Sequence, residues 1–220
     1  MSEAGARVAV DVAVCTVRDH ALQVLLAQAT GGPFAGAWAL PGGLVRRDES
    51  LDAAAVRALR ARTGLHDVYL EQLYTFGRPD RDPATRVVSV AYVGLIPHAG
   101  RFPGRLARGT DADVAWCPVR RLPPLAYDHG DVIATAVTRL RAKLQYTNLV
   151  YTLLAATFTL SELQAVYEAI LARRLDRRNF RKKILSTGLL AALDRVRRGA
   201  HRPATLYRFR RRHPMTVAII

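Results

Sequence analysis

The sequence has few cysteines, few acidic residues and no long hydrophobic run. Its two cysteines, Cys15 and Cys117, lie in apolar, strand-like segments, and neither has a second Cys or a His at metal-ligand spacing. We therefore expect buried free thiols in a reducing cytoplasm. No apolar stretch approaches the ~18 residues of a membrane span, and the first residues lack the apolar core of a signal peptide. The expected protein is cytoplasmic and has no membrane segment.

Acidic residues are scarcest in the last third of the chain. The 33 Lys and Arg residues exceed the 18 Asp and Glu residues, so the formal net charge is +15. Residues 1–150 hold 18 basic and 14 acidic residues, whereas residues 151–220 hold 15 basic and 4 acidic residues. Evenly scattered charge would indicate a solubilising surface. An excess gathered in one segment favours a polyanionic partner, with nucleic acid ahead of a membrane surface.

Hydrophobic patterning predicts a mixed domain over residues 1–145. Alternation and β-branched residues predict strands, and apolar residues at helical spacing predict helices, the first of which ends at the glycine Gly64. The predicted strands are Val8–Val17, Leu22–Ala29, Val68–Phe76, Arg86–Ile96 and Asp113–Val119, and the predicted helices are Ser50–Arg62 and Asp131–Leu144. Strands mixed with two helices indicate an α/β or α+β sandwich.

Residues 146–220 form a second predicted domain with a helix-turn-helix pattern. Thr159 and Glu162 are spaced as a capping box, which predicts a helix that begins at Leu160. Asp176 is placed to cap a second helix, Arg177–Leu185, whose apolar side is Phe180 and Ile184. The remainder of that second helix is strongly basic, as in a helix that enters the DNA major groove.

A basic β-hairpin is predicted after the two helices. The segments Ala192–Val196 and Thr205–Phe209 flank the basic stretch 197–202, as in the wing of a winged helix, and this favours DNA binding over a basic helical bundle. Arg and Asn suit base edges, and Lys suits phosphates. The predicted DNA contacts are Arg177, Arg178, Asn179 and Arg181 for bases, Lys182 and Lys183 for phosphates, and Arg197, Arg198, His201 and Arg202 in the wing.

The segment from Trp38 to Leu65 resembles the Nudix box, G-x5-E-x7-R-E-U-x-E-E-x-G-U, where U is apolar. The residues at the expected positions are Gly43, Glu49, Arg57, Leu59, Gly64 and Leu65. The resemblance covers residues 7–145 and implies a Nudix α/β/α sandwich. It also implies structural roles for Gly43, Glu49, Arg57 and Gly64, with Glu49 and Arg57 holding the box loop to its helix.

The metal-binding part of the box is missing. The R-E-U-x-E-E core reads Arg57-Ala58-Leu59-Arg60-Ala61-Arg62. Positions 58, 61 and 62 share one helix face, which carries the Mg²⁺-binding carboxylates in active members of the family. We therefore expect neither a metal nor catalysis. The alternative is an active Nudix pyrophosphohydrolase whose site is rebuilt by other carboxylates, for which Asp48, Asp52, Glu71, Asp80 and Asp82 are available.

A degenerate Nudix domain followed by a basic winged helix resembles the Nudix-related transcriptional regulators. Segments such as Tyr69–Gly77, Arg86–Tyr92 and Leu175–Leu185 are similar to theirs. The resemblance implies a homodimeric repressor of NAD metabolism genes that binds double-stranded operator DNA and is released by ADP-ribose or a related nucleotide or sugar. Our candidate ligand-binding residues are Arg62, Trp38, Phe76, Arg78 and Arg86. A third interpretation, an RNA-binding scaffold, requires exposed stacking aromatics in the basic unit, where only Tyr207 and Phe209 are suitable.

Overall fold

The computed structural model describes residues 5–97, 114–197, 203–217 and 219. The chain forms two compact units. Of the described residues, the first unit takes in those within 1–15, 23–95 and 101–136, and the second takes in those within 16–22, 96–100 and 137–220. Within these ranges no helix combines the length and the apolarity that crossing a bilayer would require.

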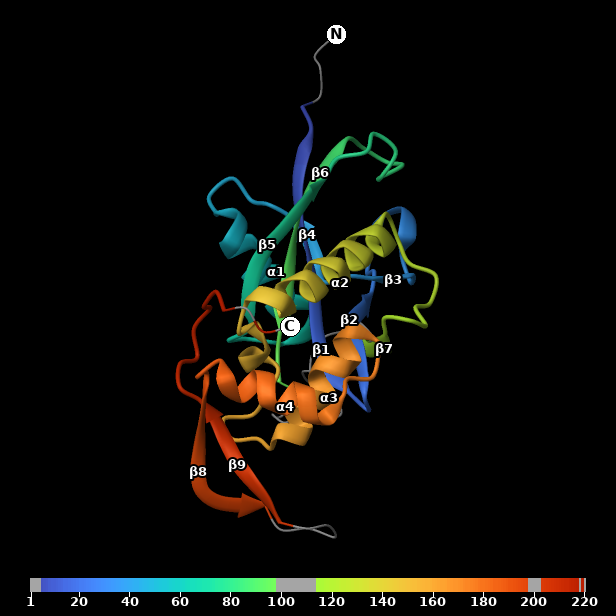
Figure 1. The fold of residues 1–220 in the computed structure, drawn as a ribbon. Helices are drawn as coiled ribbons and strands as arrows, with labels where there is room; N and C mark the ends of the chain where they lie inside the picture. Colours follow the sequence, from blue (N-terminus) through green and yellow to red (C-terminus); the bar gives the residue numbers. More distant parts are fainter. Residues whose placement is uncertain (1–4, 98–113, 198–202, 218, 220) are drawn as a thin grey trace. The chain divides into compact units, whose positions relative to one another are not determined.

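A mixed β-sheet forms the centre of the first unit (Figure 1). Its strands are β1 (Arg7–Arg18), β2 (Ala21–Gln28), β3 (Trp38–Ala39), β4 (Gly42–Leu44), β5 (Tyr69–Phe76), β6 (Val87–Leu95) and β7 (Val114–Pro118). The main order is β3-β2-β1-β6-β5, with β4 paired to β1 and β7 paired to β2. Strands β1 and β6 run parallel to each other, while β4, β5 and β7 pair antiparallel with their neighbours.

The central strands are covered on both faces. In β1 the eight consecutive residues Ala9–Thr16 are all buried, and in β6 burial is nearly continuous. A parallel pair with layers on both sides is expected to be apolar along its whole length. The Val-rich sequence of β1 is therefore explained by a strand inside the core rather than by one solvated face.

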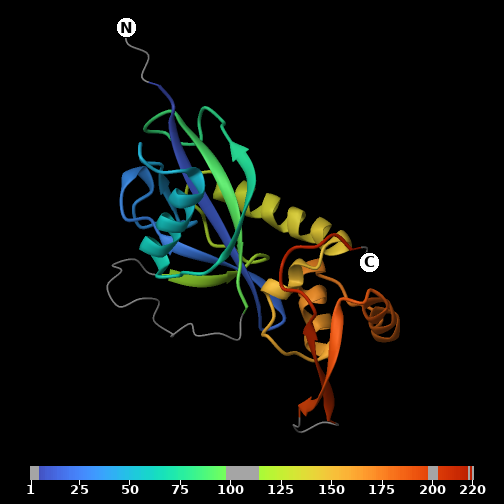
Figure 2. The same cartoon turned by 90° about the vertical axis from the view of Figure 1, so that its left-hand side faces the viewer.

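Two helices complete the layers of the first unit. Helix α1 (Leu51–Thr63) begins after Ser50, whose Oγ accepts a hydrogen bond from the Ala53 amide at 3.1 Å, and ends at Gly64, where φ is 71°. Helix α2 (His129–Tyr146), of which residues 129–136 belong to this unit, buries Ile133, Val137, Leu140 and Leu144. Figure 2 shows α1 and the start of α2 on opposite faces of the sheet, which confirms the α/β/α sandwich.

The second unit is a winged helix. It contains a 3-10 helix (Leu149–Thr152), α3 (Leu160–Leu171), α4 (Arg177–Ser186) and the antiparallel hairpin of β8 (Leu190–Arg197) and β9 (Ala204–Phe209). Both bonds of the predicted capping box are present, since Thr159 Oγ accepts from the Glu162 amide at 3.2 Å and Glu162 Oε2 accepts from the Thr159 amide at 2.7 Å. Asp176 Oδ1 caps α4 at the Asn179 amide.

Aromatic side chains hold the winged helix together. The rings of Tyr167 and Phe180 join α3 to α4 at a centroid distance of 5.2 Å, and those of Phe158 and Phe209 are 5.1 Å apart. Phe209 is only 5% exposed, so it is a core residue rather than a stacking platform. On α3, Val166 is buried and Leu171 is only half-buried.

The two thiols differ. Cys15 is buried in β1, as predicted, and burial raises its pKa to about 12. Cys117 is only half-buried, which corrects the prediction, because every residue of β7 is half-buried. Burial also raises the pKa of the Cys117 thiol.

Candidate functional site

The loop of the Nudix box is tied to α1 by one ion pair. Arg57 donates from Nε to Glu49 Oε2 at 2.8 Å and from Nη2 to Glu49 Oε1 at 2.5 Å. Its Nη2 also donates to the Leu44 carbonyl at 3.0 Å, and the Arg46 amide donates to Glu49 Oε1 at 2.8 Å. The hydrogen bonds from Arg57 are the main cause that lowers the pKa of Glu49 to about 2. The box therefore keeps its structural pair.

The face of α1 that would hold Mg²⁺ offers no oxygen ligand. Ala58 is buried, Ala61 is exposed, and Arg62 is half-buried and donates to Thr30 Oγ1 at 2.5 Å. In the part of the chain that the structure describes, no three His, Cys, Asp or Glu side chains gather as a metal site. Mg²⁺ needs oxygen ligands and would meet a guanidinium here, so the residues present do not fit the metal.

The alternative carboxylates have other contacts. Asp52 accepts from the Tyr92 hydroxyl at 2.6 Å, Glu71 from the Tyr69 hydroxyl at 2.8 Å, and Asp82 from the Ala84 amide at 2.8 Å. These residues come from a helix, a strand and a loop, and they do not converge on one metal-binding point.

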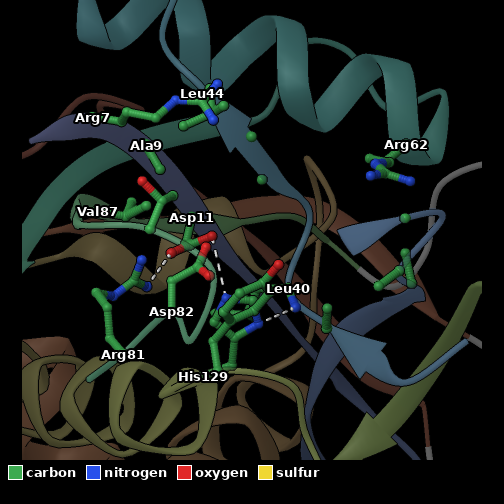
Figure 3. Close-up of a pocket in the computed structure, with 18 of the residues that line it drawn as sticks. Arg7, Ala9, Asp11, Leu40, Leu44, Arg62, Arg81, Asp82, Val87 and His129 are labelled. Carbon is green, nitrogen blue, oxygen red and sulfur yellow. Dashed lines mark hydrogen bonds and ion pairs between the residues drawn. The ribbon is translucent and has the colours of Figure 1, made fainter. Parts of the chain in front are cut away.

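A cavity of about 190 Å³ lies over one face of the sheet, beside the Nudix box (Figure 3). Strand β1 contributes alternate residues, Arg7, Ala9 and Asp11, because successive side chains on a strand point to opposite faces. Ala27 and Ala39 are register partners on β2 and β3 and also line the cavity. Small side chains from three strands thus leave the space in which a ligand can lie.

A buried ionic cluster supports the floor of this cavity. Arg81 donates from Nη2 to Asp11 Oδ2 at 3.0 Å and to Asp128 Oδ1 at 2.8 Å, and from Nε to Asp128 Oδ2 at 3.1 Å. Ser89 Oγ donates to Asp11 Oδ2 at 2.5 Å. The Arg81, Asp11 and Asp128 side chains are only 3%, 8% and 2% exposed. Buried charges are retained where they are paired and hydrogen-bonded in this way.

His129 completes the cluster, and its hydrogen bonds favour one tautomer of the ring. The Leu40 amide donates to His129 Nδ1 at 2.9 Å, so Nδ1 carries a lone pair and the proton is on Nε2. Nε2 lies 3.3 Å from Asp11 Oδ1 (Figure 3). Burial alone would raise the pKa of Asp11, but its interactions with His129, Ser89 and Arg81 outweigh burial and lower it to about 2. Asp11 is therefore a carboxylate at neutral pH.

Steric crowding requires a glycine at position 42, directly before Gly43 of the Nudix box. A Cβ there would lie 2.4 Å from Asp11 Oδ1 and 2.6 Å from the Val10 carbonyl oxygen. At the predicted Gly43, an added Cβ would have no atom of the described residues within 4 Å. The close approach of β4 to β1 therefore depends on Gly42.

Tyr127 contributes an aromatic ring to the cavity lining, near both carboxylates and guanidinium groups. Its ring lies 4.6 Å from that of Phe34 and 5.3 Å from that of His129. Burial raises its pKa, Asp82 and Asp11 raise it further, and Arg81 and Arg62 oppose them. Carboxylates, guanidinium groups and an aromatic ring thus share one cavity, a combination suited to a ligand with an anion, hydroxyl groups and a ring.

Of the five predicted ligand residues, only Arg62 lines the cavity. Trp38 is half-buried on β3, and the Phe76 ring packs against Tyr74 at 5.4 Å. Arg78 lies near Asp80 and Asp131, at 3.7 and 3.8 Å, and Arg86 donates to the Arg78 carbonyl at 3.2 Å.

Sequence reasoning missed Asp11, Arg81, Tyr127 and His129. An aspartate within the Val-rich run of β1 was the one available signal, because carboxylates seldom enter a buried strand unless they are paired. The partners come from a loop and from the start of α2. Arg81 is 70 positions away from Asp11 in the sequence, and no local pattern marks it.

The predicted DNA-contacting residues fall into distinct environments. Five of those on α4 are exposed: Arg177, Arg178, Asn179, Lys182 and Lys183. Arg181 is half-buried, and its Nη2 donates to Ser161 Oγ at 3.2 Å. Arg197 forms an ion pair with Glu162. Arg198, His201 and Arg202 lie outside the described residues.

Comparison with known proteins matches both units. The NUDIX domain model matches residues 6–136, and the NrtR DNA-binding winged helix domain model matches residues 150–209. The chain is 36% identical over 202 residues to the ADPR responsive transcriptional repressor of Acinetobacter baylyi, covering 91% of this chain and 80% of that protein.

Solved structures agree with both family models. NrtR of Shewanella oneidensis, complexed with a 27mer DNA, has a TM-score of 0.78 and 33% identity over 92% of this chain and 93% of that one. The NUDIX domain of the same protein, complexed with ADP ribose, has a TM-score of 0.55 and 35% identity over 62% of this chain and 89% of that one. The chain therefore belongs to the NrtR family, in which a Nudix domain is followed by a DNA-binding winged helix.

Proposed function

We propose that the protein is a DNA-binding transcriptional repressor that responds to ADP-ribose or a closely related nucleotide and controls genes of NAD or related metabolism in the cytoplasm. The observation that carries the proposal is the exposed basic surface of α4 in a winged helix, formed by Arg177, Arg178, Asn179, Lys182 and Lys183. The DNA complex of the Shewanella oneidensis relative supports it.

The cavity of the Nudix unit is the proposed effector site. Its lining includes Arg7 and Arg62, which suit a pyrophosphate, and the ADP ribose complex of the relative's NUDIX domain supports this ligand. Arg62 would pair with the pyrophosphate where a hydrolase uses Mg²⁺. The ligand regulates only if it binds the free and DNA-bound conformations with different affinities.

We also propose that the Nudix unit does not hydrolyse its ligand. The positions that supply carboxylates in the active family carry Ala58, Ala61 and Arg62, and the residues on this face do not fit Mg²⁺. A homodimer is part of the proposal, because two copies would read a palindromic operator with two helices in successive major grooves.

Fluorescence anisotropy with a labelled duplex of the region upstream of the gene tests the repressor proposal. We expect salt-dependent binding that ADP-ribose weakens, and a dimer mass by light scattering. A parallel assay with ADP-ribose and Mg²⁺ should release no AMP or ribose 5-phosphate. The proposal of a repressor is wrong if no duplex is bound, and turnover with Mg²⁺ would favour the pyrophosphohydrolase instead.

A further inference from the structure

The basic side chains of α4 lie on different sides of the helix, and these sides do not follow the division by residue type that the sequence suggested. Phe180 and Ile184 are buried and mark the inner side of the helix. Arg178 is two residues before Phe180, and Lys182 is two residues before Ile184. Two residues correspond to about 200° around a helix, so Arg178 and Lys182 lie on the outer side. Arg177 is three residues before Phe180, and Arg181 is three residues before Ile184. Each arginine is therefore about 60° around the helix from a buried residue, on the flank beside the core.

The flank of Arg177 and Arg181 borders a groove within the winged helix. Its other walls are the start of α3, with Ser161, and strand β9, with Thr205 and Tyr207. The arginines contribute the charge of this groove. The nearby carboxylate of Glu162 is already engaged, because it accepts from the Thr159 amide and pairs with Arg197.

The guanidinium of Arg181 is fixed by one hydrogen bond, while its Nε has no partner among the described residues. Its Nη2 donates to Ser161 Oγ at 3.2 Å, which fixes the guanidinium against α3. Its Nε is buried and, among the residues that the structure describes, has no hydrogen-bond partner. A buried donor without a partner is rare in folded proteins and indicates a missing acceptor. A guanidinium that lines a groove and is not neutralised by a carboxylate suits the oxygen atoms of a phosphate.

We propose that this groove binds a phosphate of the DNA backbone, held by Arg177 and Arg181, while Arg178 and Lys182 reach the bases from the outer side. The inference rests on the proposed DNA-binding function and revises two predictions made from sequence. Arg177 and Arg181 move from base reading to phosphate binding, and Lys182 moves from phosphate binding to the reading face. A residue that binds a phosphate positions the helix and carries no sequence information.

The first test compares Arg181→Ala with Arg178→Ala on two duplexes: one selected by the wild-type protein from a random library and a scrambled duplex of the same composition. Arg181→Ala should weaken binding to both by the same factor and reduce the slope of log K against log salt by about 1. Arg178→Ala should cost about 5- to 150-fold more on the selected duplex than on the scrambled one. Arg181→Lys, which keeps the charge, should lose less than Arg181→Ala.

The second test replaces single backbone phosphates of the selected duplex by neutral methylphosphonates. For the wild type we expect one linkage in each half-site at which the replacement weakens binding, and this loss should be absent for Arg181→Ala. The inference is overturned if Arg181→Ala lowers the preference for the selected duplex, or if every linkage keeps its effect in that variant. If the wild type binds neither duplex, the proposed function itself fails.

Discussion

Arg57 donates two hydrogen bonds to the carboxylate of Glu49, from Nε at 2.8 Å and from Nη2 at 2.5 Å, and so joins the loop of the Nudix box to the middle of α1. The carboxylate of Glu49 is thereby held ionised, with its pKa lowered to about 2. In the unfolded chain a glutamate titrates at about 4.3.

This difference predicts a pH dependence of stability. Between those pKa values the unfolded chain binds more protons at Glu49, so acid favours unfolding. The stabilisation from the pair is complete above about pH 4.3 and is lost as the pH falls towards 2. Urea unfolding from pH 6 to pH 3 should show the advantage of the wild type over Glu49→Gln shrinking below about 4.3. A difference that stays constant over this range would contradict the role of the pair.

Gly42 should tolerate no side chain. The Cβ of Gly42→Ala would lie 2.4 Å from Asp11 Oδ1, so β4 or the carboxylate must move, at a cost of about 1–3 kcal/mol. Gly43→Ala is the matched control, since its Cβ would have no neighbour within 4 Å in the part of the chain that the structure describes. Chemical denaturation of both variants measures the difference, and equal free energies of unfolding would contradict the crowding at Gly42.

The buried cluster predicts a strong dependence of stability on Arg81. Removing its guanidinium in Arg81→Ala leaves Asp11 and Asp128 buried without a counter-charge, and this should lower the free energy of unfolding by about 3–5 kcal/mol. Arg78→Ala removes the same charge from the same loop, but its side chain is 62% exposed and the effect should stay within about 0.5 kcal/mol. Comparable losses in the two variants would show that burial of the cluster does not matter.

Arg62 should bind the effector without a metal. We expect Arg62→Ala to lower the affinity for ADP-ribose by about 10- to 100-fold in calorimetry without Mg²⁺, the effect of losing a charge-assisted hydrogen bond. Arg60→Ala is the control, because Arg60 is exposed on the same helix and does not line the cavity. An unchanged affinity of Arg62→Ala would remove this residue from the site.

Local signals in the sequence predicted the elements well. Thr159 and Asp176 cap α3 and α4 as expected, and Gly64 takes the left-handed conformation that ends α1. These features depend on residues a few positions apart, so one sequence is enough to recognise them.

The site was harder to predict because its parts meet only in the folded chain. Arg62 could be found from its place in the box, whereas Arg81 and His129 reach Asp11 from distant segments. Arg181 shows the same limit on α4, since its position in the sequence could not reveal that Ser161 holds it in a groove.

The three alanines that line the cavity limit how mutations can alter its volume. Ala9, Ala27 and Ala39 already carry the smallest side chains that keep a β-carbon. Almost every substitution at these positions adds volume, so single mutations can narrow the range of accepted ligands but can hardly widen it. A larger residue such as leucine at position 27 would fill the space and yield a sensor that no longer responds, while the winged helix stays intact.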